Sequence, residues 1–300
     1  MEVDVKVDPR SIDTTLATPT AVRRLVEAHG FTFRKSLGQN FLVDGNILRG
    51  IIRAAAVSKD DLVIEIGAGI GTLTRALAST AGSVLAIEVD ARLHPILKET
   101  VAQYDNVEIV AEDAMKVDWH DFWETHGLSR AKLVANLPYY LTSPLLLNLF
   151  SQQVALDTIT VMIQKEVAQR FTAEPGTKAY GTLTVLAGYY SDVEICQVVP
   201  PTVFMPPPEV DSAIVKFTMR PYVIEAADPA LFWRVVKAGF GQRRKTLTNA
   251  LSSILGDTIS KAKLQDILRS CDISPQQRAE TLSPEDFVVL ANTLTEYWRV

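Results

Sequence analysis

A chain of 300 residues is long enough for one large domain and a second, smaller one. Its composition, 47% hydrophobic and 22% charged, is typical of a soluble globular protein, and no apolar run approaches the roughly 18 residues of a membrane span. The N-terminus has no secretory signal pattern, and Cys196 and Cys271 have no metal-like spacing, so we expect a cytoplasmic protein without a bound metal.

The net charge of −5 is unevenly distributed along the chain. Residues 1–219 carry 19 basic and 26 acidic side chains, whereas residues 220–300 carry 11 and 9. The acidity therefore lies in the first part of the chain, and basic patches can form locally. The sign of the total charge does not exclude a nucleic-acid partner.

The first predicted elements are a loose arm and two helices. Residues 1–18 are polar and lack periodicity, so we expect them to be loosely held. A short helix is predicted from Pro19 to His29, and a second helix is expected to start after the N-cap Asp44 and to end near Ala56.

Strands and helices then alternate. Strands are predicted at 62–66, 83–88, 107–110, 133–135 and 158–163, and helices at 72–79, 90–103, 144–150 and from 165 onward. Asp90 is expected to cap the 90–103 helix, and Thr142 or Ser143 the 144–150 helix. This rhythm predicts an α/β fold, a mostly parallel sheet with helices on both faces.

The pattern changes after Ser191. Two β-rich stretches, 193–199 and 213–218, flank a proline-rich segment that fits no helix, which predicts an antiparallel pair at the sheet edge. From Pro229 onward only helical patterns occur, around 231–236, 247–255, 259–268 and 287–294. We therefore expect an α/β domain at 19–220 and a small all-α domain at 221–300.

A glycine-rich loop follows the first strand of the alternating region, in the segment Glu65–Gly71. Its glycines allow a tight turn and a close approach to a ligand. A dinucleotide fingerprint would need a third glycine at position 72, which is Thr. An acid followed by G-x-G-x-G fits an S-adenosylmethionine (SAM) site better, with Gly67 and Gly69 against the cofactor.

Two acids follow the next two strands. Glu88 is placed to accept hydrogen bonds from the two ribose hydroxyls of the cofactor, and Asp113, followed by Ala114, from the adenine amine. The alternative is that both acids are helix caps or solvated loop residues. Their succession after a glycine loop favours the cofactor interpretation.

The tetrapeptide Asn136-Leu137-Pro138-Tyr139 ends an apolar run that predicts a buried strand. Ligands bind at this end of the strands in open α/β sheets. The Asn136 amide oxygen and backbone carbonyls can accept hydrogen bonds from an exocyclic amine, and a Tyr ring can stack on a base. Pro138 fixes its own φ and restricts Leu137 to extended geometry. These residues suit methylation of a nucleobase amine; the alternative is a simple turn with a core Tyr.

Taken together, these segments closely resemble the KsgA family of small-subunit ribosomal RNA adenine dimethyltransferases, over about residues 31–251. The matching segments are Ser36–Leu42, Glu65–Gly71, Asn136–Tyr139, Gln164–Arg170, Lys178–Gly181, Phe204–Ser212 and Arg243–Leu247.

The resemblance implies a Rossmann-like methyltransferase sheet that uses SAM to transfer two methyl groups to each of two adjacent adenosines. The adenosines lie in the 3′-terminal hairpin loop of small-subunit ribosomal RNA. We expect a monomer that acts on this RNA within a pre-ribosomal particle. The implied cofactor contacts are Gln39, Asn40, Leu42, Gly67, Gly69, Glu88, Asp113, Ala114 and Asn136.

The adenine amine is a poor nucleophile because its lone pair is delocalised into the ring. Hydrogen bonds to the Asn136 side-chain oxygen and the Leu137 carbonyl would favour a pyramidal nitrogen, and orientation would supply most of the rate enhancement. Tyr139 is expected to hold one face of the flipped-out base, and Phe204, exposed beside the prolines, the other. The alternative for Phe204 is a core position.

Candidate RNA contacts are the basic residues Lys165, Arg170, Lys178, Arg243, Arg244 and Lys245. The last three are expected to begin a helix. The alternative to a phosphate contact is that they only form a solvated face of that helix.

Three alternatives stay open from the residues. The related large-subunit RNA dimethylases usually have Ile where this chain has Leu137, and usually lack Gly38 and the Arg-Arg-Lys-Thr-Leu segment. A non-catalytic RNA-binding assembly factor would not need Asn136 and the glycine loop. DNA adenine methylases usually carry Pro-Pro within the turn. Tyr140 stands where relatives often have a small polar residue, and the sequence offers no account of it.

Overall fold

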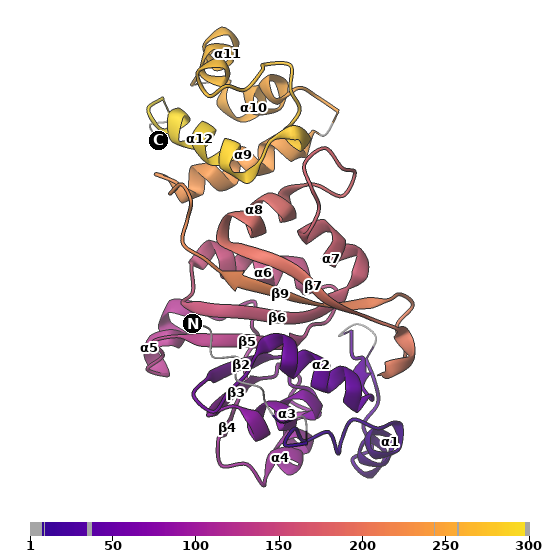
Figure 1. Ribbon diagram of the computed structural model, residues 1–300. Helices are drawn as coiled ribbons and strands as arrows, with labels where there is room; N and C mark the ends of the chain where they lie inside the picture. Colours follow the sequence, from indigo (N-terminus) through magenta and orange to yellow (C-terminus); the bar gives the residue numbers. More distant parts are fainter. Residues whose placement is uncertain (1–7, 9, 35–37, 243, 257, 298–300) are drawn as a thin grey trace. The chain divides into compact units, whose positions relative to one another are not determined.

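A computed structural model describes residues 8, 10–34, 38–242, 244–256 and 258–297 (Figure 1). The chain forms two compact units, the first made of residues 1–168 and 193–219 and the second of residues 169–192 and 220–300. The chain passes between the units three times, and the predicted domain boundary near Pro221 lies beside the last of these passages, after Met219. Residues 169–192, however, group with the C-terminal helices, whereas the sequence pattern had assigned them to the α/β part.

The first unit contains a seven-stranded sheet in the order β4-β3-β2-β5-β6-β9-β7 (Figure 1). Strands β4 to β6 in this order are parallel, and β9 runs antiparallel to β6, which confirms the mostly parallel sheet. The strand order reverses between β2 and β5, and such a switch point is where open α/β sheets bind ligands. The strands are β2 (Leu62–Ile66), β3 (Ser83–Ile87), β4 (Val107–Val110), β5 (Ala131–Asn136), β6 (Leu156–Gln164), β7 (Ser191–Val199) and β9 (Ser212–Met219).

Helices cover both faces of this sheet. Ile51 of α2 (Gly45–Ala55) and Leu77 of α3 (Thr72–Thr80) share one apolar cluster with strand residues that include Ile214 of β9. Side chains alternate along a strand, so Phe217 of β9 faces the other way, and its ring packs against Phe150 of α6 (Thr142–Gln152) with centroids 5.8 Å apart. The predicted two-sided arrangement is therefore confirmed.

Some helix ends differ from the predictions. Helix α4 (His94–Val101) begins four residues after Asp90 and has Leu93 as its N-cap, because the Asp90 carboxylate accepts instead from Arg92 and Gln39. Helix α6 begins at Thr142 with Leu141 as its N-cap and no side-chain cap, so neither Thr142 nor Ser143 has the predicted role. Helix α1 (Pro19–Ala28) and α2, with Asp44 as N-cap, agree with the predictions.

Several elements were not predicted, among them helix α8 (Thr182–Tyr190). Helix α5 (Trp119–Thr125) lies between β4 and β5, and a short 3₁₀ helix η2 (Pro201–Val203) lies in the proline-rich segment that was expected to hold no helix. Strands β1 (Phe41–Leu42) and β8 (Phe204–Met205) form a separate antiparallel pair, in which Leu42 lies opposite Phe204. This pair joins two segments that contribute to the site described below.

Residues 11–17 are not loosely held, as their composition had suggested, whereas residues 1–7 and 9 of the predicted arm lie outside the described residues. Ile12 and Ala17 are buried in the core, and the Asp13 carboxylate accepts from the Arg75 guanidinium at 2.7 Å. Arg75 also donates to the Thr100 carbonyl at 2.5 Å, and the Thr100 hydroxyl donates to the Ile70 carbonyl. The segment is thereby fastened to α3 and, through Thr100, to the glycine loop.

The second unit is helical. Its core centres on α9 (Pro229–Gly241), which packs against α8 (Thr182–Tyr190), α10 (Leu247–Leu255) and α12 (Pro284–Thr295). The Tyr180 hydroxyl donates to the Leu282 carbonyl at 2.6 Å, which fastens the segment before α8 to the one before α12. Helix α11 (Lys261–Ser270) packs on α10 and α12, and α7 (Lys165–Phe171) spans the division between the two units.

Candidate active site

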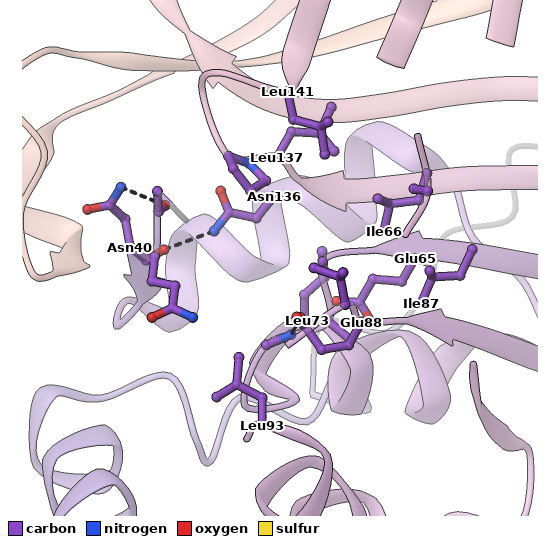
Figure 2. Close-up of a pocket in the computed structure, with 18 of the residues that line it drawn as sticks. Asn40, Glu65, Ile66, Leu73, Ile87, Glu88, Leu93, Asn136, Leu137 and Leu141 are labelled. Carbon is purple, nitrogen blue, oxygen red and sulfur yellow. Dashed lines mark hydrogen bonds between the residues drawn. The ribbon is translucent and has the colours of Figure 1, made fainter. Parts of the chain in front are cut away.

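A cavity of about 300 Å³ opens at the carboxyl ends of the parallel strands in the first unit (Figure 2). It is lined by the residues that follow β2, β3, β4 and β5, together with segment 38–42 and Phe204. The cavity thus lies at the switch point between β2 and β5. The structure brings together all of the predicted cofactor residues from five separate stretches of the chain.

The glycine loop bends sharply between β2 and α3. The Gly67 amide donates to the Ile87 carbonyl at 2.8 Å, which fastens the loop to the end of β3. Gly71 has φ +89° and serves as the N-cap of α3, and a Cβ there would lie 2.5 Å from the Thr100 hydroxyl. A larger residue would therefore be strained and would push α4 away from the loop.

Glu88 is buried with 5% of its surface exposed, directly after β3. Its carboxylate accepts from the amides of Gly69 at 2.7 Å and Asp90 at 2.8 Å, one on each oxygen. Burial raises the pKa of Glu88, although the two amides and the His94 ring oppose this shift. Each carboxylate oxygen can accept a second hydrogen bond, so the predicted ribose contact is compatible with this geometry.

Glu65 is a second buried acid in the cavity wall, and the sequence had not singled it out as a ligand. It is 1% exposed, and its Oε2 has no hydrogen-bond partner among the described residues. Burial and the neighbouring Glu88 charge raise the pKa of Glu65 to about 8 against an opposing contribution from Thr74. The strand pattern LVIEI, with an acid inside an otherwise apolar buried run, was the signal that could have found it.

Asp113 lines the cavity after β4, next to the buried Ala114. Its Oδ1 accepts from the Met115 amide at 3.0 Å, so it also caps the turn that follows. Asp113 therefore both caps a turn, which was the alternative interpretation, and lines the cavity. Its contact with the adenine amine stays a prediction.

Segment 38–42 forms another wall. Gln39 donates from Nε2 to Asp90 at 2.9 Å and accepts the Arg34 amide, so both ends of its amide bind protein groups. The Asn40 side chain donates to the Gly38 carbonyl, and Leu42 is buried at 3% exposure. These bonds give Gln39 a role in fixing the wall, beside the predicted contact to the cofactor.

The Asn-Leu-Pro-Tyr turn closes the cavity opposite the glycine loop. The Asn136 side chain points at the Asn40 backbone, where Nδ2 donates to the carbonyl at 3.2 Å (Figure 2). The Leu137 amide donates to the Met162 carbonyl of β6, and its side chain is 2% exposed. A carbonyl oxygen only accepts, so the Asn136 nitrogen must face Asn40, and its Oδ1 is left to accept from another group.

The Tyr139 ring is partly buried, and its hydroxyl shares a 2.7 Å hydrogen bond with Ser212 of β9. Phe204, in contrast, is only 4% exposed and belongs to the apolar core, because β8 pairs with β1 and carries the ring inward. The predicted exposed presentation of Phe204 is therefore wrong. The side chain still contributes to the cavity lining.

The candidate RNA residues occur in both units. In the first unit Lys165 pairs with Asp211 at 3.2 Å, which neutralises part of its charge. In the second unit Arg170, Lys178, Arg244 and Lys245 are exposed. Arg243 lies outside the described residues. Arg244 and Lys245 precede α10, whose N-cap is Thr246, so these two residues do not begin a helix as predicted.

Within the described part of the chain, no group of three or more His, Cys, Asp or Glu side chains could hold a metal ion. No helix of the described residues is both long and apolar enough to cross a bilayer.

A Rossmann-like sheet with a glycine loop, strand-end acids and a cavity at its switch point defines the chain as a SAM-dependent methyltransferase, with SAM as the methyl donor. Residues 30–296 match the family model described as ribosomal RNA adenine dimethylase. The chain belongs to this family, and its substrate class is ribosomal RNA.

Named relatives agree with this assignment. The chain is 46% identical to ribosomal RNA small subunit methyltransferase A of Geobacillus thermodenitrificans, across 95% of this chain and 99% of the relative. It is 48% identical to the protein of the same name from Lactiplantibacillus plantarum, across 95% of this chain and 97% of the relative.

Solved structures show the same fold. A dimethyladenosine transferase from Plasmodium falciparum superposes with a TM-score of 0.74 at 27% identity, covering 86% of this chain and 98% of the other. The 23S rRNA methyltransferase ErmE follows with a TM-score of 0.65 at 25% identity, covering 85% and 100%.

Proposed function

We propose that the protein methylates the N6 amines of two adjacent adenosines in the 3′-terminal hairpin loop of small-subunit (16S) ribosomal RNA, giving dimethyladenosines. Support comes from the two bacterial relatives, whose names specify the small subunit and whose identities are 46% and 48%. The neighbour that acts on 23S RNA is only 25% identical. Leu137 and Gly38, which the large-subunit enzymes usually lack, support the same choice.

The observation that carries the proposal is the fixed orientation of the Asn136 amide. Because Nδ2 is held by the Asn40 carbonyl, Oδ1 is available as an acceptor at the wall of the cavity. An adenine amine that donates to Oδ1 and to the Leu137 carbonyl is drawn toward pyramidal geometry, which localises its lone pair. Bound SAM supplies an electrophilic methyl group, and a correctly oriented amine needs no strong base before attack.

The cavity residues fit this cofactor. The backbone of the glycine loop lines the cavity and leaves room for a ligand close to it. Glu88 and Asp113 can accept hydrogen bonds from hydroxyls and an amine. As positive charge develops on the target nitrogen, the preorganised Asn136 and Leu137 oxygens stabilise it. The methylated nitrogen is acidic and can release its proton to water.

Tyr139 is suited to hold one face of the target base. Its hydroxyl bond to Ser212 limits ring rotation, so a stacked base would meet a preorganised surface. Stacking on an aromatic ring contributes about 1–3 kcal/mol per base. Phe204 sits in the cavity wall rather than at its mouth, and it therefore supports the base only if the base enters deeply.

The substrate RNA would lie within a pre-ribosomal particle, and the protein would act as a cytoplasmic monomer; these remain predictions. Exposed Arg244 and Lys245 are the best candidates for phosphate contacts, since both project into solvent.

The test is to incubate the protein with labelled SAM and unmethylated small-subunit particles and to map the modified bases. We expect labelled dimethyladenosine at two adjacent positions near the RNA 3′ end. Particle binding without methylation would instead support the assembly-factor alternative. Label in large-subunit RNA would favour the other dimethylase class.

A further inference from the structure

Tyr140 is the feature that neither the family comparison nor the mechanism explains. Its side chain is 57% exposed, an unusual state for a large aromatic side chain. It nevertheless lines the cofactor cavity, so the exposed ring stands at the cavity mouth.

The rings of Tyr139 and Tyr140, which are neighbours in one turn, contact different parts of the protein. The Leu141 amide donates to the Pro138 carbonyl at 2.9 Å, which places Tyr139 and Tyr140 at the two central positions of a β-turn. Tyr139 is held by Ser212 on β9. The Tyr140 ring instead packs on the segment at Gly38, where its Cδ1 is 3.6 Å from the place that a Cβ would occupy.

The surroundings of Tyr140 belong to the cofactor side of the cavity. Besides burial, the charges of Asp113 and Glu88 raise the pKa of the Tyr140 phenol, so the hydroxyl stays neutral. Both acids are the proposed partners of the adenosine part of the cofactor. The exposed apolar side chains of Val89 and Met115 line the same cavity from the ends of the neighbouring strands.

We propose that the Tyr140 ring covers the outer face of the cofactor's adenosine and is a determinant of cofactor affinity. The proposal rests on the assignment of Glu88 and Asp113 to the adenosine part. A Tyr ring has only two side-chain torsions, so it can be ordered over a flat ligand at low entropic cost. The adenosine part is far from the transferred methyl group. The contact with Tyr140 should therefore increase the affinity for SAM and for the demethylated product, S-adenosylhomocysteine, by the same factor.

Calorimetric titration of both ligands into the RNA-free protein tests the proposal. Tyr140→Ala should raise Kd about tenfold for each ligand, a ratio that corresponds to about 1.4 kcal/mol. Tyr140→Phe should bind both ligands like the wild type, because the ring and not the hydroxyl makes the contact. Tyr297→Ala removes an exposed ring from the second unit and should change neither Kd.

Two outcomes would overturn the proposal. The first is normal binding of both ligands by Tyr140→Ala; weaker RNA binding by the same variant, measured separately, would then show that the ring contacts RNA instead. If only SAM binding weakens, the ring lies at the sulfonium and not over adenosine. Glu88→Ala is titrated in parallel to test separately whether adenosine lies beside Glu88. Normal binding of both ligands by that variant would contradict this placement of adenosine, whatever the Tyr140 variants show. Thermal denaturation of each variant shows that it is folded.

Discussion

The Asn136 side-chain nitrogen lies 3.2 Å from the Asn40 carbonyl oxygen, which joins the end of β5 to the wall that precedes α2. The two residues are 96 positions apart, and the bond sets which face of the amide is presented to the cavity. Catalytic orientation in this protein therefore depends on a long-range contact and not on the turn alone.

Asn136→Ala should lower methyl transfer by at least about 100-fold while weakening SAM binding only partly. Loss of one preorganised transition-state contact commonly has an effect of this size. Single-turnover transfer and equilibrium SAM binding should be measured on the same samples. Asn148→Ala on α6, outside the cavity lining, is the matched control. Near-normal turnover of Asn136→Ala would contradict the proposed mechanism.

Phe204→Ala should destabilise the protein by about 3–5 kcal/mol, as expected for removal of a buried aromatic ring. The reason is that Phe204 is 4% exposed and packs in the sheet core. Urea denaturation gives the free energy of unfolding, and the exposed Tyr140→Ala serves as a comparison with little expected loss. An unchanged stability would restore the exposed-ring interpretation.

Glu65 should make stability depend on pH. Its pKa of about 8 in the folded protein lies above the roughly 4.3 of an unfolded chain, so the folded state holds more protons between these values. Stability from this group is thus complete at low pH and declines as pH rises toward 8. Glu65→Gln, a neutral isostere, should remove this decline and be more stable than wild type at pH 8. Parallel pH curves for wild type and Glu65→Gln would be inconsistent with a protonated Glu65, and Glu99→Gln is the exposed control.

Asp13 should contribute the opposite dependence. Hydrogen bonds from Thr15 and Tyr104 and the Arg75 charge outweigh burial and lower its pKa to about 2. Because the folded pKa lies below the unfolded value, the stabilisation is present above about pH 4 and is lost as pH falls toward 2. Asp13→Asn should lose about 2 kcal/mol at pH 7 and much less at pH 2.5, by urea denaturation. Asp8→Asn, at an exposed site, should show no such difference; equal losses at both pH values would exclude the ionic contribution.

Arg244→Ala/Lys245→Ala should weaken RNA binding and flatten its salt dependence. Each lost phosphate contact reduces the slope of log K against log salt by about 0.7 to 0.9. The control is Arg23→Ala/Arg24→Ala, which removes the same charge from α1. An unchanged slope in the Arg244/Lys245 variant would exclude this pair from the RNA interface.

Sequence patterns could predict the elements whose signals are local. Strand β2 and the N-cap Asp44 agree with expectation because apolar runs and caps act over a few residues. Helix α8 was missed because its residues Thr182–Tyr190 are apolar on nearly every side, and a helix buried all round has no 3.6-residue alternation to detect. The short helix α5 offered too few turns for a periodic signal.

Local sequence patterns therefore suffice for the alternating α/β order, the glycine loop and the Asn-Leu-Pro-Tyr turn, because each depends on neighbouring residues. Three other features are set by tertiary contacts: Phe204 is buried, Arg75 holds Asp13 of the N-terminal segment, and Tyr140 stands at the cavity mouth. These features depend on contacts between residues that are far apart in the chain. The energies of such contacts cannot be predicted from a local sequence pattern.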